Sequence, residues 1–182
     1  KKDVGYILIG FAVLMYGMEF MSDAVEPLKD MPEFTSILTA FTNPFLGILT
    51  GMVLTAIIQS SSASVGILQA LSLTGSITYG MALPIIMGQN IGTCVTSLIS
   101  SIGVSKNAKK VAVVHISFNL IGTIIFTAIY CVAHYMIELP ILAQAITPVN
   151  IAIIHSIFNI STTIILLPFS KVLVTIANTV IK

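Results

Sequence analysis

The chain has 182 residues, of which 56% are hydrophobic and 8% are charged, and its mean hydropathy is +1.04. Soluble domains carry about 25% charged residues, so this composition predicts an integral membrane protein. The net charge is only +1 and there is no arginine, so we expect no nucleic-acid partner. Cys94 and Cys131 make neither a disulfide framework nor a metal-binding motif.

The first predicted element is a transmembrane helix over residues 4–25. Its apolar stretch is long enough to cross a bilayer, which takes about 20 residues. Gly10 and Gly17 within it are suited to close helix packing. Residues 34–41 are expected to form a short interfacial helix. Acidic side chains crowd the end of the first helix and the loop that follows it: Glu19, Asp23, Glu26, Asp30 and Glu33.

Residues 45–73 are predicted to form a re-entrant helical hairpin. Residues 45–58 and 64–73 are apolar, but each piece is too short to cross the bilayer. Between them lies a polar run from Gln59 through Ser62, which we place at the tip. This topology puts every lysine except Lys29 on one side of the membrane, as the excess of lysine in cytoplasmic loops requires.

The remaining chain is predicted to contain three spans. The first, over residues 79–102, is expected to be interrupted by Pro84 and by residues 88–90, whose sequence is Gly-Gln-Asn. The other two cover residues 111–133 and 149–169. The whole chain, 1–182, is therefore predicted to be a single all-α transmembrane domain that combines spans, a re-entrant hairpin and a broken helix.

A short internal repeat marks the last two spans. Residues 111–119 recur as residues 151–159, and each copy carries a histidine and, four residues on, an asparagine. Residues four apart lie on one face of a helix. His115 and Asn119, with their counterparts His155 and Asn159, could line a cavity. The alternative is that they form hydrogen bonds between helices.

Polar runs within hydrocarbon are tolerated only where protein buries them or where they line a wet cavity. Serine hydroxyls and the N–H groups of a helix start can hold an anion. Amide and carbonyl oxygens suit Na⁺, and broken helices are a usual construction of transporter sites. The alternative is that the serines only join neighbouring helices.

Two motifs carry a resemblance to a known family. Gln59-Ser60-Ser61-Ser62-Ala63, together with Gly88-Gln89-Asn90-Ile91-Gly92-Thr93, resembles the type II sodium–phosphate cotransporters and their bacterial, PhoU-associated relatives. The resemblance implies two inverted repeats, and the lysine pattern matches the second. Gln89 departs from the alanine of many bacterial relatives. We therefore expect a second repeat as partner, either from a longer chain or from an antiparallel homodimer.

The resemblance also implies a function and a site. We expect sodium-coupled symport of inorganic phosphate by a multi-pass protein of the cell (inner or plasma) membrane, with Na⁺ as coupling ion and no enzymatic activity. The expected phosphate ligands are Ser60, Ser61, Ser62 and Thr93. The expected sodium ligands are Gln59, Ser60, Gln89, Asn90 and Thr96.

Two other readings stay open. An intramembrane serine hydrolase would pair a serine with His115 or His155, but a third group must orient the histidine and no carboxylate lies within these spans. A non-transporting membrane fragment or assembly subunit is compatible with the presence of a single repeat.

Overall fold

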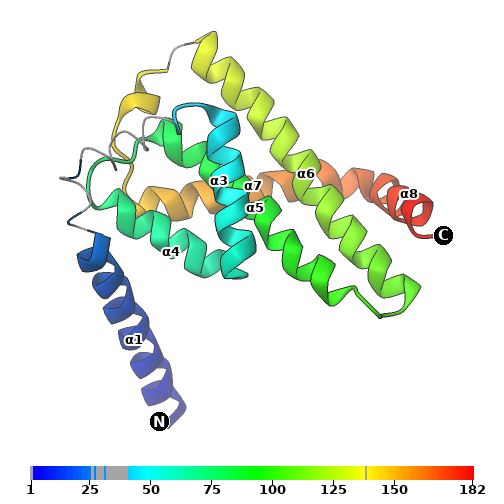
Figure 1. Cartoon of the computed structure of the whole chain (residues 1–182), viewed down its shortest axis with the longest axis horizontal. Coiled ribbons are helices and arrows are strands. Elements are labelled where there is room, and N and C mark those ends of the chain that lie inside the picture. The colour runs from blue at the N-terminus through cyan, green and yellow to red at the C-terminus, as the bar shows by residue number, and fades with distance from the viewer. Residues whose placement is uncertain (1, 26, 28–30, 32–40, 138) are drawn as a thin grey trace.

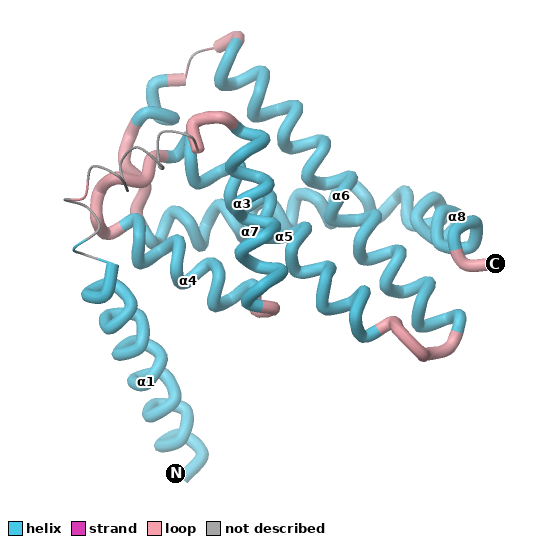
Figure 2. Tube along the Cα trace, in the orientation of Figure 1, coloured by secondary structure: helices cyan, strands magenta, loops and turns pink. Residues whose placement is uncertain are grey.

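The computed structural model describes residues 2–25, 27, 31, 41–137 and 139–182. These residues form helices and no strand, which confirms the all-α expectation (Figures 1 and 2). The helix predicted over 34–41 falls, except for Phe41, outside the described residues. The longer helices are α1 Lys2–Val25, α3 Pro44–Ile58, α4 Ser61–Ser72, α5 Tyr79–Ser100, α6 Lys106–Tyr135, α7 Pro148–Leu166 and α8 Ser170–Val180. The short 3₁₀ helices are η2 Pro140–Ala143 and η3 Leu167–Phe169.

Within the described residues, four stretches of helix are long and apolar enough to cross a membrane: Lys2–Met21, Tyr79–Ser100, Lys106–Tyr135 and Pro148–Val180. The last of them continues through η3 into α8, beyond the predicted end at residue 169. Helix α3 is apolar but shorter, over Pro44–Ile58. Helix α1 projects away from the rest of the protein and packs mainly against α4 (Figure 1).

Helices α3 and α5 run in the same direction and pack with their backbones almost in contact. A Cβ atom added at Gly51 would overlap the carbonyl of Ile85, and one at Gly88 would overlap the carbonyl of Ile48. Gly92 likewise faces the carbonyl of Met52. Small residues four apart allow such close approach inside membranes. This contact fixes α5 beside the end of α3, where the polar run begins.

Helix α5 corrects the sequence prediction, because it is continuous from Tyr79 to Ser100. The expected interruption at residues 88–90 is absent, and Pro84 is accommodated inside the helix. A glycine is needed at position 88 because the backbone of α3 lies against it, and the helix does not unwind there. No main-chain carbonyls are therefore freed at mid-helix, and any cation ligand from this motif has to come from a side chain.

The apolar core lies where α4, α5 and α7 meet. Its fully buried members include Ile77, Ile86 and Ile151. Helix α4 is also tied to the start of α7, since Gln69 Nε2 donates a 2.9 Å hydrogen bond to the carbonyl of Pro148. The core thus holds the second helix of the predicted hairpin to the last long span.

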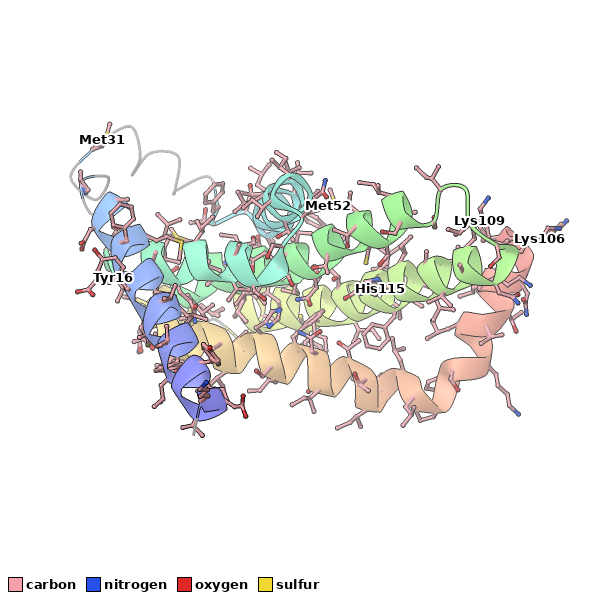
Figure 3. All side chains as sticks on the ribbon, turned by 90° about the horizontal axis from the view of Figure 1, so that it is seen from below. Tyr16, Met31, Met52, Lys106, Lys109 and His115 are labelled. Carbon is pink, nitrogen blue, oxygen red and sulfur yellow. The ribbon has the colours of Figure 1, made fainter. Side chains whose placement is uncertain are left out.

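Helices α3 and α4 are joined by a two-residue turn and then diverge. In Figure 1 α4 runs across the direction of α3, and in Figure 3 α3 is seen end-on at Met52 while α4 lies lengthwise. The pair therefore forms an open angle and not a tight antiparallel hairpin. Whether the pair enters and leaves the bilayer on one side stays a prediction.

Candidate functional site at the α3–α4 turn

The polar motif forms the turn between α3 and α4. Gln59 ends α3 in the left-handed conformation, with φ 57°, and its N–H donates to the carbonyl of Thr55. Few residues other than glycine adopt positive φ, and doing so stores strain. Ser60 then caps α4, because its hydroxyl accepts a hydrogen bond from the N–H of Ala63 at 3.3 Å. The sequence folds sharply here at a strained glutamine followed by a serine cap.

This turn brings together two helix ends of opposite polarity. The carbonyls at the end of α3 carry partial negative charge, and the N–H groups at the start of α4 carry partial positive charge. Ser62 is exposed and Ser61 is half-buried beside these N–H groups. One short segment therefore offers oxygen acceptors for a cation and N–H and O–H donors for an anion.

A buried polar network fixes this turn to α5. Thr55 Oγ1 donates to Ser64 Oγ at 2.8 Å, and Gln89 Nε2 donates to Ser64 Oγ at 2.9 Å and to the Ser64 carbonyl at 3.0 Å. All three side chains are buried, with Gln89 and Thr55 at 0% exposure. Because the Ser64 carbonyl can only accept a hydrogen bond, the Gln89 amide is oriented with Nε2 toward Ser64 and Oε1 away from it. The network links the two polar motifs through one serine.

Gln89 Oε1 is buried, yet it has no hydrogen-bond partner among the residues that the structure describes. An orphaned buried acceptor costs about 1–3 kcal/mol, so such an atom calls for a partner from outside the protein, a water or a cation. The amide oxygen is a hard ligand of the kind that Na⁺ prefers. Of the predicted sodium ligands, Gln89 is the one whose surroundings support the role most directly.

The other predicted ligands on α5 use their polar groups within the helix. Asn90 Nδ2 donates to the carbonyl of Ile86 at 2.9 Å, which leaves its Oδ1 as an acceptor. The hydroxyls of Thr93 and Thr96 donate to the carbonyls of Gln89 and Thr93. Each threonine oxygen keeps lone pairs, so both can still accept a hydrogen bond or bind a cation.

Their position on α5 follows from the register of α3 and α5. Gly88 lies against Ile48 and Gly92 against Met52, so each turn of α5 meets the equivalent turn of α3. Thr96 is four residues, about one turn, beyond Gly92 on α5. The same register therefore puts Thr96 level with the last turn of α3, just before Gln59. The α5 hydroxyls are thus on the helix that runs past the α3–α4 turn.

The two asparagines of the histidine–asparagine pairs form equivalent hydrogen bonds. Asn119 Nδ2 donates to the carbonyl of His115 at 3.0 Å, and Asn159 Nδ2 donates to that of His155 at 2.8 Å, so each asparagine bonds back to its own helix. His115 also reaches across to α5, where its Nδ1 lies 2.8 Å from Ser97 Oγ. His155 Nε2 is buried without a hydrogen-bond partner. His115 lines a cleft between α5 and α6.

Sequence reasoning missed Thr55 and Ser64, which connect the motifs. Ser64 follows the serine run after Ala63, and Thr55 lies four residues before Gln59 on the same face of α3. That spacing, polar residues one helical turn to either side of the motif, is the signal that could have identified them.

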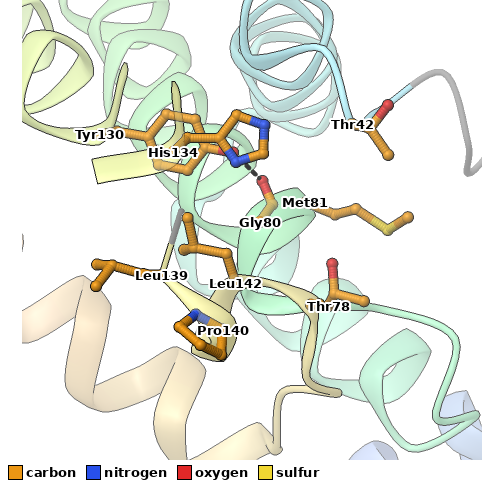
Figure 4. Close-up of a pocket in the computed structure, with 10 residues that line it drawn as sticks. Thr42, Thr78, Gly80, Met81, Tyr130, His134, Leu139, Pro140 and Leu142 are labelled. Atoms are coloured by element: carbon orange, nitrogen blue, oxygen red, sulfur yellow. Dashed lines mark hydrogen bonds between the residues drawn. The ribbon is translucent and has the colours of Figure 1, made fainter. Parts of the chain in front are cut away.

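Two cavities near the start of α5 lie away from this turn. One, of about 480 Å³, is lined by Thr78, Met81 and His134, and there the Tyr130 hydroxyl donates to the Gly80 carbonyl at 2.9 Å (Figure 4). A neighbouring apolar cavity of about 340 Å³ lies between α5, α6 and α7. The α3–α4 turn is instead an open surface, with Gln59 and Ser60 exposed.

The comparison with protein families decides the identification. The family model described as Na⁺/Pi-cotransporter matches residues 13–177. The chain belongs to this family. The match covers the α3–α4 turn, all of α5 and both histidine–asparagine pairs.

Three relatives show how far the similarity extends. The chain is similar to the "Uncharacterized protein YqeW" of Bacillus subtilis, with 29% identity over 93% of the chain and 55% of the relative. It is 30% identical to human "Sodium-dependent phosphate transport protein 2B" over 71% of the chain and 20% of the relative. It is 24% identical to the "Putative inorganic phosphate export protein YjbB" of Escherichia coli over 99% of the chain and 33% of the relative. The chain thus spans about half of YqeW and less of the others, and no solved structure matches it.

Proposed function

We propose that this chain is half of a transporter that moves inorganic phosphate across the cell membrane together with Na⁺. Phosphate is held at the α3–α4 turn by the hydroxyls of Ser60, Ser61 and Ser62 and by the N–H groups that begin α4. Thr93 adds a hydroxyl from α5. Na⁺ is held by oxygens of Gln59, Ser60, Gln89, Asn90 and Thr96.

The observation that carries this proposal is the orphaned Gln89 Oε1 next to the turn. The chain has no arginine, and its lysines lie outside α3, α4 and α5, so no cationic side chain on these helices neutralises a bound phosphate. A co-bound Na⁺ supplies that charge. It also satisfies the buried oxygen, so one ion answers both needs.

The openness of the turn supports the need for a second half. Gln59, Ser60 and Ser62 are exposed, yet an ion site in a membrane has to be enclosed by protein. A second repeat, from a longer chain or from an antiparallel copy, covers the turn and completes the coordination. In many transporters the site forms where broken helices or hairpins from two inverted repeats meet.

The family includes a relative named as sodium-dependent and another named as a phosphate exporter. We propose Na⁺-driven uptake for this chain because its polar groups suit a cation beside the anion. Export without Na⁺ is the competing direction of transport. The serine-hydrolase reading has less support, because the family is one of transporters and neither α5 nor α6, which carry Ser97 and His115, contains a carboxylate.

The direct test is uptake of radiolabelled phosphate into proteoliposomes that hold the complete protein. An inward Na⁺ gradient should drive accumulation, and an equal choline gradient should not. A Gln89→Ala variant that inserts normally should lose the Na⁺-driven component. Phosphate movement that is equally fast under both gradients would favour the exporter reading instead.

A further inference from the structure

A second polar cleft lies at the C-terminal end of α5, between this helix and the start of α6. It has a volume of about 400 Å³. Its polar lining consists of Ser97, Ser100 and Ser101 from α5 and His115 from α6, and Val104 and Ala108 stand on its α6 side. Ser97 is eight residues beyond Gln89 on α5, which is about 12 Å at 1.5 Å per residue. No residue of α3, of α4 or of the turn between them lines the cleft, so it is a different surface from the one at the α3–α4 turn.

The lining offers hydrogen-bond donors. Ser97 Oγ and His115 Nδ1 lie 2.8 Å apart. If the hydroxyl donates to Nδ1, the neutral imidazole carries its proton on Nε2, which is then a free donor. The exposed Ser100 hydroxyl takes part in no hydrogen bond within the described residues. The cleft thus keeps two donors for a ligand, the Ser100 hydroxyl and His115 Nε2–H.

The surroundings are cationic. Lys106 and Lys109 lie in the first turn of α6, on either side of Ala108, which lines the cleft (Figure 3). The sequence has no acidic residue from 34 to 137 or after 138. The acidic residues that the structure describes, Asp3, Glu19 and Asp23, all lie on α1. Helix α1 is at the opposite end of the molecule from Lys106 and Lys109 (Figure 3), so no described carboxylate competes for these lysines.

The start of α6 adds to this potential. Ser105 caps the helix by accepting from the Ala108 N–H at 3.4 Å, and helix N-termini attract anions. A neutral ligand gains nothing from the lysines, and a cation is repelled. The combination of donors, positive charge and a cavity of this size fits a tetrahedral oxyanion.

We propose that the cleft between α5 and α6 is a second oxyanion site, which binds inorganic phosphate or the phosphate group of an anionic lipid without Na⁺. The anion accepts hydrogen bonds from the Ser100 hydroxyl and from His115 Nε2–H, the tautomer that the Ser97 hydroxyl holds by donating to Nδ1, and it lies within the field of Lys106 and Lys109. The site does not depend on the transport proposal, because it requires neither the α3–α4 turn nor a cation.

The experiment measures inorganic phosphate binding by ³¹P NMR line broadening, in choline buffer, on the complete protein in nanodiscs of phosphatidylcholine. Binding is expected, and Ser97→Ala combined with Ser100→Ala should weaken it about tenfold. Lys106→Gln with Lys109→Gln should weaken it too. Ser156→Ala and Lys171→Gln are the matched controls, because Ser156 is exposed on α7 and bonded within its own helix, and Lys171 lies on α8.

A second variant guards against misfolding. Val104 is 42% exposed at the cleft, so Val104→Glu should fold normally and abolish the binding through charge repulsion. Adding phosphatidylglycerol to the nanodiscs identifies the source of the anion. If this lipid displaces phosphate, the lipid headgroup occupies the site; if it does not, the free ion does. Absence of binding in choline, or binding that Val104→Glu leaves unchanged, refutes the site while leaving Na⁺-dependent transport untested by this experiment.

Discussion

Gln89 Nε2 donates a 2.9 Å hydrogen bond to Ser64 Oγ, and this bond joins the two polar motifs that lie about 25 residues apart in the sequence. Ser64 lies one turn into α4, and Gln89 lies at the middle of α5. The same serine accepts from Thr55 on α3. Three helices therefore converge on one hydroxyl just beneath the α3–α4 turn, and Gln89 Oε1 is left over as a buried acceptor.

Na⁺ should stabilise the protein through Gln89. At ten times its dissociation constant a bound ion contributes about 1.4 kcal/mol, and this corresponds to a rise in Tm of about 3–5 °C. Gln89→Met should remove that rise, because it replaces the amide by an apolar group of similar size. The measurement is Tm in detergent with Na⁺ and with choline.

The matched control for this prediction is Gln69→Met. Gln69 bonds to the Pro148 carbonyl away from the turn, so its loss should lower Tm in both buffers by the same amount and keep the Na⁺ shift. A Na⁺ shift that survives in Gln89→Met would remove Gln89 from the sodium site.

The strained conformation of Gln59 separates stability from transport. Glycine adopts φ near 57° without strain, so Gln59→Gly should change stability by less than about 0.5 kcal/mol, since the relief of strain offsets the greater freedom of the unfolded chain. Gln59→Val should destabilise by about 1–3 kcal/mol, because a β-branched residue fits this region poorly.

Both Gln59 variants should lose Na⁺-driven phosphate uptake, because both lack the amide oxygen. Thermal unfolding and uptake measured on the same preparations provide the comparison. Full uptake in the stable Gln59→Gly variant would mean that the side chain takes no part in binding.

The close contact of α3 with α5 gives a stability prediction. Gly88→Ala should destabilise the protein by about 1–3 kcal/mol, because the added methyl overlaps the Ile48 carbonyl and the helices have to separate. Gly10→Ala on α1 is the control, since nothing lies within 4 Å of its added Cβ. Equal Tm values for the two variants would contradict this packing.

The re-entrant path of residues 45–73 is tested by accessibility. Single cysteines at Asn43 and Ser76, in a protein whose Cys94 and Cys131 are replaced by alanine, should react with an impermeant maleimide from the same side of the membrane. Labelling from opposite sides would show that the segment crosses the bilayer. The open angle between α3 and α4 is compatible with either result.

The sequence predicts the helices well and the contacts between them poorly. The number and order of the spans follow from local hydropathy, but their lengths do not, because α6 begins at Lys106 and the last stretch runs to Val180. The prediction of a break at residues 88–90 was wrong, because a glycine can either unwind a helix or allow a neighbouring helix to approach closely. Only the position of α3 distinguishes these two roles. For the same reason close packing was expected at Gly10 and Gly17, where the structure has open space.

The site shows the same division. The identities of Gln59 and Gln89 were apparent as polar residues in apolar surroundings, but their connection through Ser64 depends on how three helices converge. The Ser97–His115 contact likewise joins residues 18 apart, which no local pattern in the sequence places together.

Coupling between the anion and the cation is the central claim, because the turn carries no cationic side chain. Isothermal titration of phosphate into the complete protein, in Na⁺ and in choline buffer, measures it most directly. The high-affinity binding should tighten as Na⁺ rises, since the two binding free energies are reciprocally coupled. Ser61→Ala or Ser62→Ala should weaken it by about 1–3 kcal/mol, whereas Lys106→Gln should leave it unchanged. Phosphate binding of equal strength in Na⁺ and in choline would contradict the account.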